Sequence, residues 1–313
     1  MSTVSRVING AGDVAVRPET RKRILDAVHE LGYRPNAMAR GLKLSTTGAL
    51  GVLVPSLRNP LWSEIIHGAV GRAWERDFVV LLAEDTGEDS VQEAYERLVA
   101  EGRIDGLLVL SARSGSPILE RLARDRIPVV FANRGLPGSG RNVVMDEDAT
   151  MILIADHLVS LGHRCVGHID GPPDIDTAAR RVAAFERLAA DLGIELLVEH
   201  TPFDEQGGLT AMERMLTGKP RPTACVVASI NQVIGAVRAV REKRIGVPED
   251  LYLVSVDEEP LLDYLDVPVT GVELPLFELG IAAADALIEQ IGGGAPCDIV
   301  LATAPSLVRR EGG

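Results

Sequence analysis

Cysteine is scarce in this chain of 313 residues. Cys165, Cys225 and Cys297 are the only three, and they lie far apart in the sequence. An odd number of widely spaced cysteines is poorly suited to a disulfide framework and suits a reducing compartment better. We therefore interpret the three cysteines as small hydrophobic residues of the core.

Long apolar runs are missing as well. A helix that crosses a bilayer needs about 20 predominantly apolar residues, and no segment of this chain approaches that length. The first residues include Ser, Arg, Asn and Gly, where a secretory signal needs an apolar segment. These two absences predict a protein that stays in the cytoplasm.

Sequence motifs of common catalytic centres are absent too. The chain contains no G-x-x-x-x-G-K-[ST] phosphate loop, no G-x-S-x-G nucleophile elbow and no H-E-x-x-H metal helix. The nearest approach to a metal site is His163, Cys165 and His168. Successive side chains of a strand alternate between its two faces, so these three are not expected to converge. We expect no enzymatic activity, no metal and no cofactor.

The overall composition is that of a soluble globular protein, with 46% hydrophobic and 25% charged residues, and it excludes a disordered chain. The net charge of −13 is unevenly distributed. Residues 1–43 hold eight basic and four acidic side chains, a net charge of +4, which leaves −17 for the remainder. A basic head on an acidic body is typical of a DNA-binding appendage.

From Ala49 onward, strand-length apolar runs alternate with amphipathic segments. The apolar runs form two sets, which are 50–54, 78–83, 106–110 and 129–132, then 165–169, 224–228 and 251–256. The amphipathic segments include 61–76, 88–102, 149–162, 177–192 and 231–244. This alternation predicts an α/β body with two doubly wound parallel sheets, each covered by helices on both faces. Ligands of such sheets bind beyond the carboxyl ends of the strands, so we expect a cleft between two lobes.

The first 43 residues predict helices instead. Apolar residues at positions 4, 7 and 8 form one face of a first short helix, with polar residues opposite. A second helix begins at Pro18 and ends at Gly32. Pro35 begins a third short helix that runs through Leu42, and residues 44–48 are a linker.

Three stretches of this head occur in a particular order, Thr-Val-Ser-Arg-Val-Ile-Asn-Gly at 3–10, Arg-Lys-Arg-Ile-Leu at 21–25 and Arg-Pro-Asn-Ala at 34–37. They resemble the head of the LacI/GalR family of lactose-repressor-like transcriptional regulators across residues 2–42. The resemblance implies a small all-α head at 1–43, with a partial helix-turn-helix and a hinge helix that enters the minor groove. The DNA-binding residues that it implies are Ser2, Thr3, Ser5, Arg6, Asn9, Asn36, Ala39, Arg40 and Leu42. Without the resemblance, the first helix could be an ordinary amphipathic terminal helix, and Leu42 a core leucine.

The head departs from the family at its start. In the family a first helix and a turn precede the recognition helix, whereas this sequence begins at Met1. The first helix packs on the recognition helix, so we expect Val4, Val7 and Ile8 to be poorly buried and the head to fold poorly. Our hypothesis is that Met1 is an internal methionine, which mass spectrometry of the native N-terminus would decide.

The resemblance continues to the C-terminus. Asn59-Pro60, Leu161-Gly162-His163-Arg164 and Val247-Pro248-Glu249-Asp250 are among the pieces that carry it. It implies a periplasmic-binding-protein-like effector-binding and dimerisation domain at 49–313. The first lobe covers about 49–145 and 275–303, and the second about 146–274 and 304–313. The effector-binding residues that it implies are Leu61, Trp62, Asn133, Arg181, Phe203, Ser229 and Asp257.

These side chains suit a sugar-like or polyol effector, since an aromatic ring covers apolar ring hydrogens while Arg and Asp bond hydroxyls. Structural explanations stay open: Trp62 as a core aromatic, Arg181 as a solvated helix charge, and Asp257 as a cap of the following turn. Asn133 stands where the family usually has Asp, and Ser229-Ile230 replaces an Asn-Asp pair. An unpaired buried polar group costs about 1 to 3 kcal/mol, so a common hexose is not a safe prediction. Another polyol, a sugar acid or an unrelated compound stays open.

Together the observations predict a sequence-specific regulator, a repressor, that binds double-stranded pseudo-palindromic operator DNA as a homodimer or tetramer. A small-molecule effector would control it by shifting the relative orientation of the lobes and the order of the hinge helix. The alternative is a cytoplasmic small-molecule-binding protein with little or no DNA binding because its head is truncated. A periplasmic solute-binding protein is disfavoured by the missing signal sequence.

Overall fold

The computed structural model describes Val7 and residues 16–31, 46–85, 87, 92–93, 95–124 and 127–310, with the backbone alone at 95 and 96. The chain divides into two compact units, Met1–Thr47 and Gly48–Gly313. In the first unit, helix α2 spans Pro18–Glu30, which confirms the predicted helix. Proline suits the first position because its missing N–H would have no partner there. Val7 is helical and 6% exposed, so the expectation that it is poorly buried is wrong. The predicted helix end at Gly32 and the rest of the other head helices lie outside the described residues.

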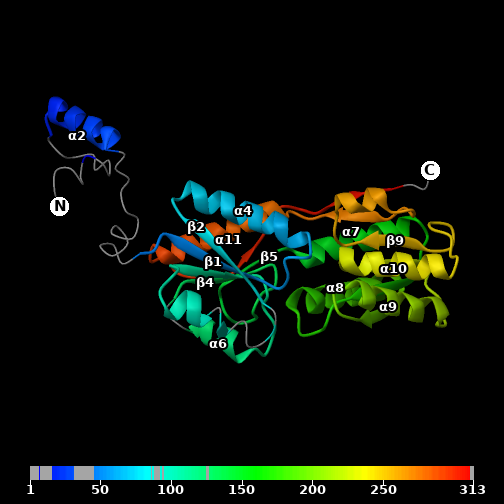
Figure 1. The fold of residues 1–313 in the computed structure, drawn as a ribbon. Coiled ribbons are helices and arrows are strands. Elements are labelled where there is room, and N and C mark those ends of the chain that lie inside the picture. Colours follow the sequence, from blue (N-terminus) through cyan, green and yellow to red (C-terminus); the bar gives the residue numbers. More distant parts are fainter. Residues whose placement is uncertain are drawn as a thin grey trace. The chain divides into compact units, whose positions relative to one another are not determined.

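The second unit contains two six-stranded sheets (Figure 1). The first sheet has the order β11-β5-β4-β3-β1-β2, and its neighbours are parallel. Its strands are β1 (Ala49–Val54), β2 (Val79–Glu84), β3 (Gly106–Val109), β4 (Val129–Ala132), β5 (Asn142–Val144) and β11 (Ile299–Val300). The helices that accompany it are α4 (Leu61–Glu75), the π-helix η1 (Tyr95–Ala100), α6 (Pro117–Arg124) and α11 (Leu276–Ile291). We call this group lobe 1.

The second sheet, with the order β12-β10-β9-β8-β6-β7, forms the centre of lobe 2. Its strands are β6 (Cys165–Asp170), β7 (Glu195–His200), β8 (Ala224–Val227), β9 (Tyr252–Ser255), β10 (Thr270–Glu273) and β12 (Ser306–Val308). The helices of lobe 2 are α7 (Glu147–Ser160), α8 (Asp176–Leu192), α9 (Glu205–Thr217), α10 (Ile230–Glu242) and the 3-10 helix η2 (Pro260–Tyr264). The edge strand β12 pairs antiparallel with β10, whereas the other neighbours are parallel.

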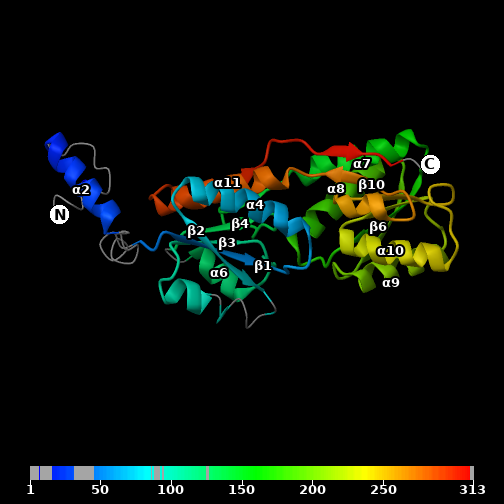
Figure 2. The same ribbon diagram turned by 45° about the horizontal axis from the view of Figure 1, so that its top comes forward.

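Helices cover both faces of each sheet, which confirms the predicted doubly wound α/β architecture. In lobe 1, α4 and α11 pack on one face and α6 packs on the other (Figure 2). In lobe 2, α9 and α10 cover one face and α7 and α8 the opposite face. Every residue of β1 is buried because apolar cores lie on both of its sides.

The chain passes between the lobes three times, from β5 to α7, from β10 to α11 and from β11 to β12. Each sheet also reverses its strand order once, between β1 and β3 in lobe 1 and between β6 and β8 in lobe 2. Such reversal points leave a crevice at the carboxyl ends of the strands. Side chains that follow β1, β3, β6 and β8 are therefore the first candidates for a ligand site.

The seven apolar runs predicted as strands are confirmed, with ends shifted by at most one residue. Strands β5, β7, β10, β11 and β12 were not predicted, and β5, β11 and β12 have only two or three residues each. Runs this short carry no periodicity that a sequence pattern could reveal. Within the part of the chain that the structure describes, no helix is long and apolar enough to cross a membrane.

The three cysteines occupy different environments and form no disulfide. Cys225 is buried in the core of lobe 2, as predicted, and Cys165 is partly buried. Cys297 is exposed, so its interpretation as a core residue is wrong. It lies after α11 in the segment that leads to the edge strand β11, where one side faces solvent.

Candidate effector site

The predicted effector residues follow the carboxyl ends of strands in both lobes. Leu61 and Trp62 open α4 after β1, and Asn133 follows β4. In lobe 2, Phe203 follows β7, Ser229 follows β8 and Asp257 lies just beyond β9, while Arg181 lies on α8. Leu61 packs in the apolar core of lobe 1, where it supports the fold. Ser229 caps α10, because its Oγ accepts a hydrogen bond from the Gln232 backbone N–H at 3.3 Å.

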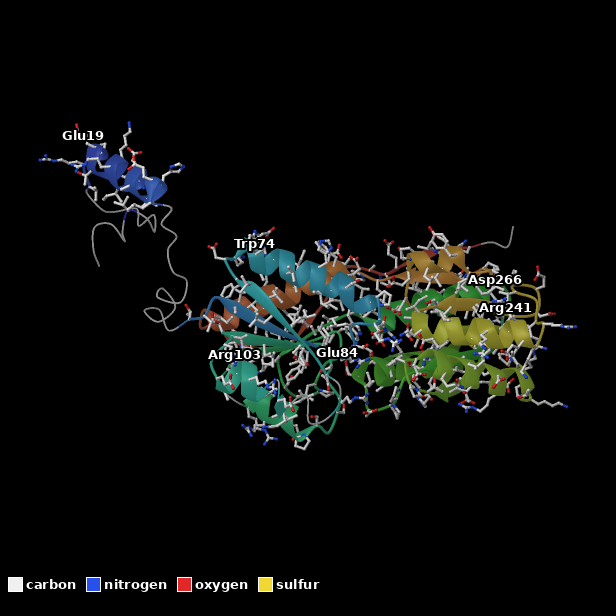
Figure 3. The ribbon with its side chains drawn as sticks, viewed as in Figure 1. Glu19, Trp74, Glu84, Arg103, Arg241 and Asp266 are labelled. Carbon is white, nitrogen blue, oxygen red and sulfur yellow. The ribbon has the colours of Figure 1, made fainter. Side chains whose placement is uncertain are left out.

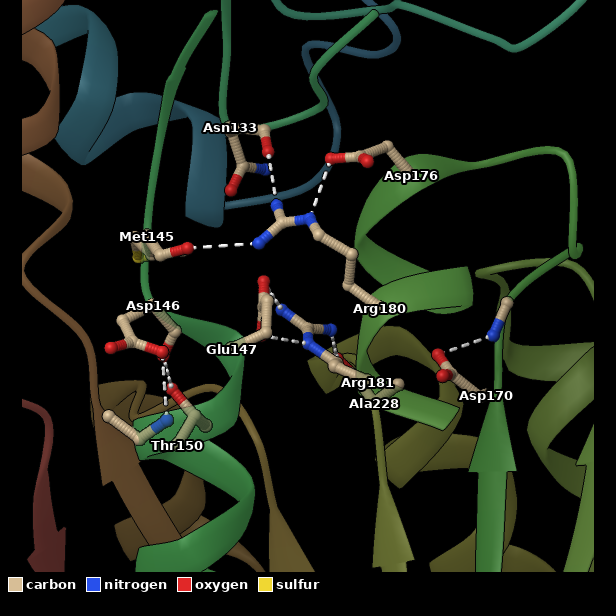
Figure 4. Close-up of polar contacts among 12 residues, drawn as sticks. Asn133, Met145, Asp146, Glu147, Thr150, Asp170, Asp176, Arg180, Arg181 and Ala228 are labelled. Carbon is tan, nitrogen blue, oxygen red and sulfur yellow. Dashed lines mark hydrogen bonds and ion pairs between the residues drawn. The ribbon is translucent and has the colours of Figure 1, made fainter. Parts of the chain in front are cut away.

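Arg181 forms a buried ion pair with Glu147, the first residue of α7 (Figure 4). Its Nε donates to Glu147 Oε2 at 2.8 Å, and its Nη1 donates to the Ala228 carbonyl at 3.4 Å. Arg181 is 3% exposed, which excludes the solvated helix charge considered above. Burial lowers the pKa of Arg181, but the nearby carboxylates led by Glu147 raise it by more, so the guanidinium stays charged.

Asp257 has one carboxylate oxygen occupied and one free. Its Oδ2 accepts a hydrogen bond from the Ile230 N–H at the start of α10, at 3.1 Å. Its Oδ1 is buried and has no hydrogen-bond partner among the described residues. Burial raises the pKa of Asp257 to about 6, although Arg181 and the Ile230 N–H act in the opposite direction. The carboxylate therefore bonds the helix start and does not cap the turn that follows it.

Asn133 presents a second unpartnered oxygen, from lobe 1. Its φ of 62° is in the left-handed region, which Asn adopts more readily than most residues. Its Oδ1 is buried and, like that of Asp257, accepts no hydrogen bond from the described residues. Buried polar atoms in native proteins are nearly always paired, so these two oxygens are candidate contacts for a ligand.

Arg180 and Asp176 of α8 connect lobe 2 to the strand ends of lobe 1 (Figure 4). Arg180 Nη2 donates to the Asn133 carbonyl at 3.4 Å, and its Nη1 donates to the Met145 carbonyl at 2.9 Å. Asp176 Oδ2 accepts hydrogen bonds from Arg180 Nε at 2.9 Å and from the Gly135 backbone N–H at 3.0 Å. These contacts hold the two lobes together around the strand ends.

Arg134 is a functional candidate that the sequence prediction missed. Its guanidinium carbon lies 5.1 Å from the ring centroid of Trp62 and 5.6 Å from that of Phe203. The two aromatic rings that were predicted to contact a sugar thus contact the guanidinium of Arg134. Trp62 also belongs to the core of lobe 1, so the core explanation for this residue is correct as well. The only signal in the sequence was a charged residue directly after Asn133 at a strand end.

The charge of Arg134 is hardly compensated. Within the described part of the chain, its side chain makes no hydrogen bond and no ion pair, and the residue is 8% exposed. Burial lowers the pKa of Arg134 to about 9, helped by Arg113 and Arg181 and opposed by Asp85 and Asp174. At neutral pH the guanidinium is still protonated.

A cavity of about 710 Å³ lies at the carboxyl ends of β2 and β3, and its volume suits a small ligand. Ser111, Arg113 and the N-terminal residues of α6 line it, and Asp174 contributes from lobe 2. Ser111 Oγ is buried and has no hydrogen-bond partner among the described residues. Arg113 and Asp174, which pair with each other at 2.8 Å, both line this cavity.

No three His, Cys, Asp or Glu side chains in the described segments are placed to hold a metal ion. His168 is buried and contacts Asp170 at 3.1 Å, whereas His163 contacts Thr223 at 2.9 Å. Both histidines thus have protein partners on different parts of the sheet.

Two sequence families match the chain. The profile of bacterial regulatory proteins of the lacI family matches residues 1–36, and that of the periplasmic binding protein-like domain matches residues 155–312. The chain is 31% identical over 298 residues to the HTH-type transcriptional repressor PurR of Aliivibrio fischeri (strain MJ11), covering 93% of this chain and 88% of that protein. The chain belongs to the LacI family.

Solved structures of LacI-family proteins resemble this one over nearly the whole chain. The Lac repressor dimer bound to operator and the anti-inducer ONPF has a TM-score of 0.84 at 26% identity, covering 98% of this chain and 93% of its own. The CelR–cellobiose complex has a TM-score of 0.78 at 28% identity, covering 99% and 95%. The LacI-family chain described here is accordingly a DNA-binding transcriptional regulator with a periplasmic-binding-protein-like body.

The predicted DNA contacts of this LacI-family head cannot be placed, because all of them lie outside the described residues. They are Ser2, Thr3, Ser5, Arg6, Asn9, Asn36, Ala39, Arg40 and Leu42. In the body, by contrast, all seven predicted effector residues are described, and Glu147, Arg180 and Arg134 join them.

Proposed function

We propose that this regulator is a repressor whose operator affinity is controlled by a small sugar-like or polyol effector bound in the interlobe cleft. The observation that carries the proposal is the pair of unpartnered buried oxygens, Asn133 Oδ1 from lobe 1 and Asp257 Oδ1 from lobe 2. Acceptors of this kind suit ligand hydroxyls, which donate one hydrogen bond each. A ligand that bonds both oxygens would stabilise one relative orientation of the lobes.

The other predicted effector residues differ in how directly they would contact the ligand. Arg181 remains a candidate donor to the ligand through the part of its guanidinium that Glu147 leaves free. Trp62 and Phe203 contact the guanidinium of Arg134, which lies beside the proposed site. Leu61 and Ser229 shape the strand ends, since one packs in the core and the other caps α10.

Effector binding would reach the DNA through a population shift between lobe orientations. Arg180 and Asp176 contact Asn133 and Gly135, so a change at the Asn133 side chain and a change in lobe orientation are coupled. We propose that residues 1–43 are the DNA-binding head, 44–48 a linker and 49–313 the effector-binding and dimerisation domain. The order of the hinge helix at 36–42 would transmit the shift.

A homodimer is part of the proposal because a pseudo-palindromic operator presents two half-sites. The edge strand β2 leaves Val79 and Leu82 exposed, and Trp74 at the end of α4 is 75% exposed (Figure 3). Unpaired strand edges and exposed aromatics are typical of surfaces that associate. We place the protein in the cytoplasm, where its DNA target is, and assign it no enzymatic activity.

The proposal is tested by selecting operators from a random DNA library with the full chain. Gel shifts on the selected duplex should show specific binding that weakens steeply between about 50 and 200 mM salt, because Lys and Arg contacts release counterions. Arg6→Ala should weaken specific binding at least about fivefold. The matched control is Arg187→Ala, which removes an exposed arginine of lobe 2 and should leave binding unchanged. Failure to select any sequence would contradict the proposal.

A further inference from the structure

Arg134 is the one feature of the candidate site that a neutral polyol does not explain. A guanidinium carries five N–H donors, and in this buried side chain none of them has an acceptor among the described residues. Burying a charged group without a hydrogen-bonded partner is costly, and native proteins avoid it unless something else supplies the partner. The side chain is therefore poised for an acceptor that the protein itself does not provide.

The neighbouring carboxylates are already committed to other cations. Glu147 binds Arg181, Asp176 binds Arg180 and Asp174 binds Arg113, each at 2.8 or 2.9 Å. Asp257 uses one oxygen for the Ile230 N–H. Among the described residues, no carboxylate forms an ion pair with Arg134, although Asp85 and Asp174 raise its pKa.

The aromatic rings of Trp62 and Phe203 favour an anion at this position over a structural role. They lie 5.1 and 5.6 Å from the guanidinium carbon, so they stabilise the positive charge without occupying its hydrogen-bond donors. A planar fork of donors in such surroundings matches the two oxygens of a carboxylate or phosphate.

We propose that the effector carries an anionic oxygen group, a carboxylate or a phosphate, that binds the guanidinium of Arg134. The inference rests on the proposed function, because it names the chemical class of the effector for that same site. The polyhydroxyl part of the ligand bonds Asn133 Oδ1 and Asp257 Oδ1. A cavity at the carboxyl ends of β2 and β3 lies in the same lobe, and the buried Ser111 hydroxyl in its wall has no hydrogen-bond partner among the described residues.

The charge pattern places the two ends of the ligand. Arg134 lacks a paired carboxylate among the described residues, whereas Arg113 pairs with Asp174 and Arg181 pairs with Glu147. Asp257 lies at the end of β9 in lobe 2 and repels an anion. A ligand with an anionic group at one end and neutral hydroxyl groups elsewhere fits both Arg134 and Asp257. A ligand with an anionic group at each end would place one of them against Asp257.

Calorimetry on the full chain tests the proposal with probes that share a six-carbon skeleton. D-gluconate supplies the carboxylate, D-glucose 6-phosphate the phosphate, and sorbitol and D-glucose are the neutral controls. We expect at least one anion to bind and neither neutral compound to match it. Arg134→Gln should lose at least about 30-fold of that affinity, since truncating one partner of a buried charge pair is costly. Arg187→Gln, which removes an exposed charge from lobe 2, should bind within twofold of the wild type.

Three further measurements guard against a variant that fails to fold. In the wild type, raising the salt concentration from about 50 to 500 mM should weaken anion binding and leave any neutral binding unchanged. Arg134→Lys should retain part of the affinity, because it keeps the charge and loses the fork. Without ligand, Arg134→Met should raise the Tm by about 2 °C or more, because an uncompensated buried cation disappears.

Three results would overturn the inference: a neutral polyol that binds as tightly as the anions, an Arg134→Gln variant with unchanged anion affinity, or no binding of either anion. These outcomes differ from failure of the proposed function. A neutral effector that alters operator affinity would uphold the function and refute the anion. Failure to select any operator sequence would refute the proposed function, and calorimetry would still test whether the protein binds an anion.

Discussion

Two buried charges of the candidate site are compensated by each other, and two are not. Arg181 and Glu147 form a direct ion pair, whereas Asp257 and Arg134 have no partner of opposite charge in hydrogen-bond contact. Uncompensated buried charges lower stability, and proteins retain them where a ligand needs them. At the scale of residues, the site therefore trades stability of the empty protein for binding.

Asp257→Asn should raise the stability of the folded protein at neutral pH. Burial raises the pKa of Asp257 from 3.8 to about 6, so the folded state binds more protons than the unfolded state between these pH values. The free energy of unfolding falls as pH rises through this window, by about 3 kcal/mol in total. Asparagine resembles the protonated form and keeps an oxygen for the Ile230 N–H.

Urea unfolding at pH 4 and at pH 7.5 measures this effect. The variant should exceed the wild type by on the order of 2 to 3 kcal/mol at pH 7.5, and by little at pH 4. Asp148→Asn, an exposed position on α7, is the matched control and should show no such difference. An equal gain at both pH values would refute the assignment of the effect to Asp257 titration.

At the scale of elements, close helix pairs fix the layers that position the strand ends. Helices α9 and α10 approach through glycines: a Cβ on Gly208 would overlap the Gln232 carbonyl oxygen, and one on Gly235 would overlap that of Glu205. A Cβ on Gly68 of α4 or on Gly280 of α11 would likewise overlap the backbone of the partner helix. The backbones are therefore too close for any side chain at these positions.

Gly208→Ala should destabilise lobe 2 by about 2 to 3 kcal/mol, because the added methyl group meets backbone that cannot move aside. Gly71→Ala on α4 is the control, since a Cβ there meets no atom within 4 Å. Alanine should instead stabilise that helix by about 0.5 to 1 kcal/mol. Thermal unfolding of both variants separates the two signs, and a neutral Gly208→Ala would contradict the close approach.

At the scale of the whole molecule, the proposed effector control depends on contacts between two lobes that have separate cores. Lobe 1 is built around β1, β3, α4 and α11, and lobe 2 around β6, β8 and their helices. Arg180 and Asp176 bridge them, with three crossings of the chain as the covalent connection. Small polar contacts between two rigid cores are suited to a shift between orientations.

Arg180→Gln should loosen the contact between the lobes. The variant loses donors to the Asn133 and Met145 carbonyls, and hydrogen bonds from a charged group contribute about 1.5 to 3 kcal/mol. Effector affinity should fall about 10-fold or more, and small-angle scattering of the ligand-free protein should show a larger radius of gyration. Arg187→Gln should change neither quantity. Unaltered effector affinity in Arg180→Gln would show that the bridge has no part in closure.

Strand ends were predictable residue by residue, because apolar runs end where the polar side chains begin. Asn133, Ser229 and Asp257 were implied by the resemblance to the family, and all three lie at carboxyl ends of strands. Arg134 was not found, since its significance depends on Trp62 from α4 and Phe203 from the other lobe. Glu147 was missed for the same reason, because nothing local to α7 points to Arg181 on α8.

The amino-acid sequence by itself determined the α/β class, the two sets of strands along the chain and the family. The first two follow from local periodicity, which each segment carries independently of the others, whereas the family was inferred from the resemblance of motifs in the head and the body. Only the tertiary structure decided which buried charges meet a partner and which stay uncompensated. That outcome depends on contacts between side chains far apart in the chain, and it is the observation from which we propose an anion beside Arg134.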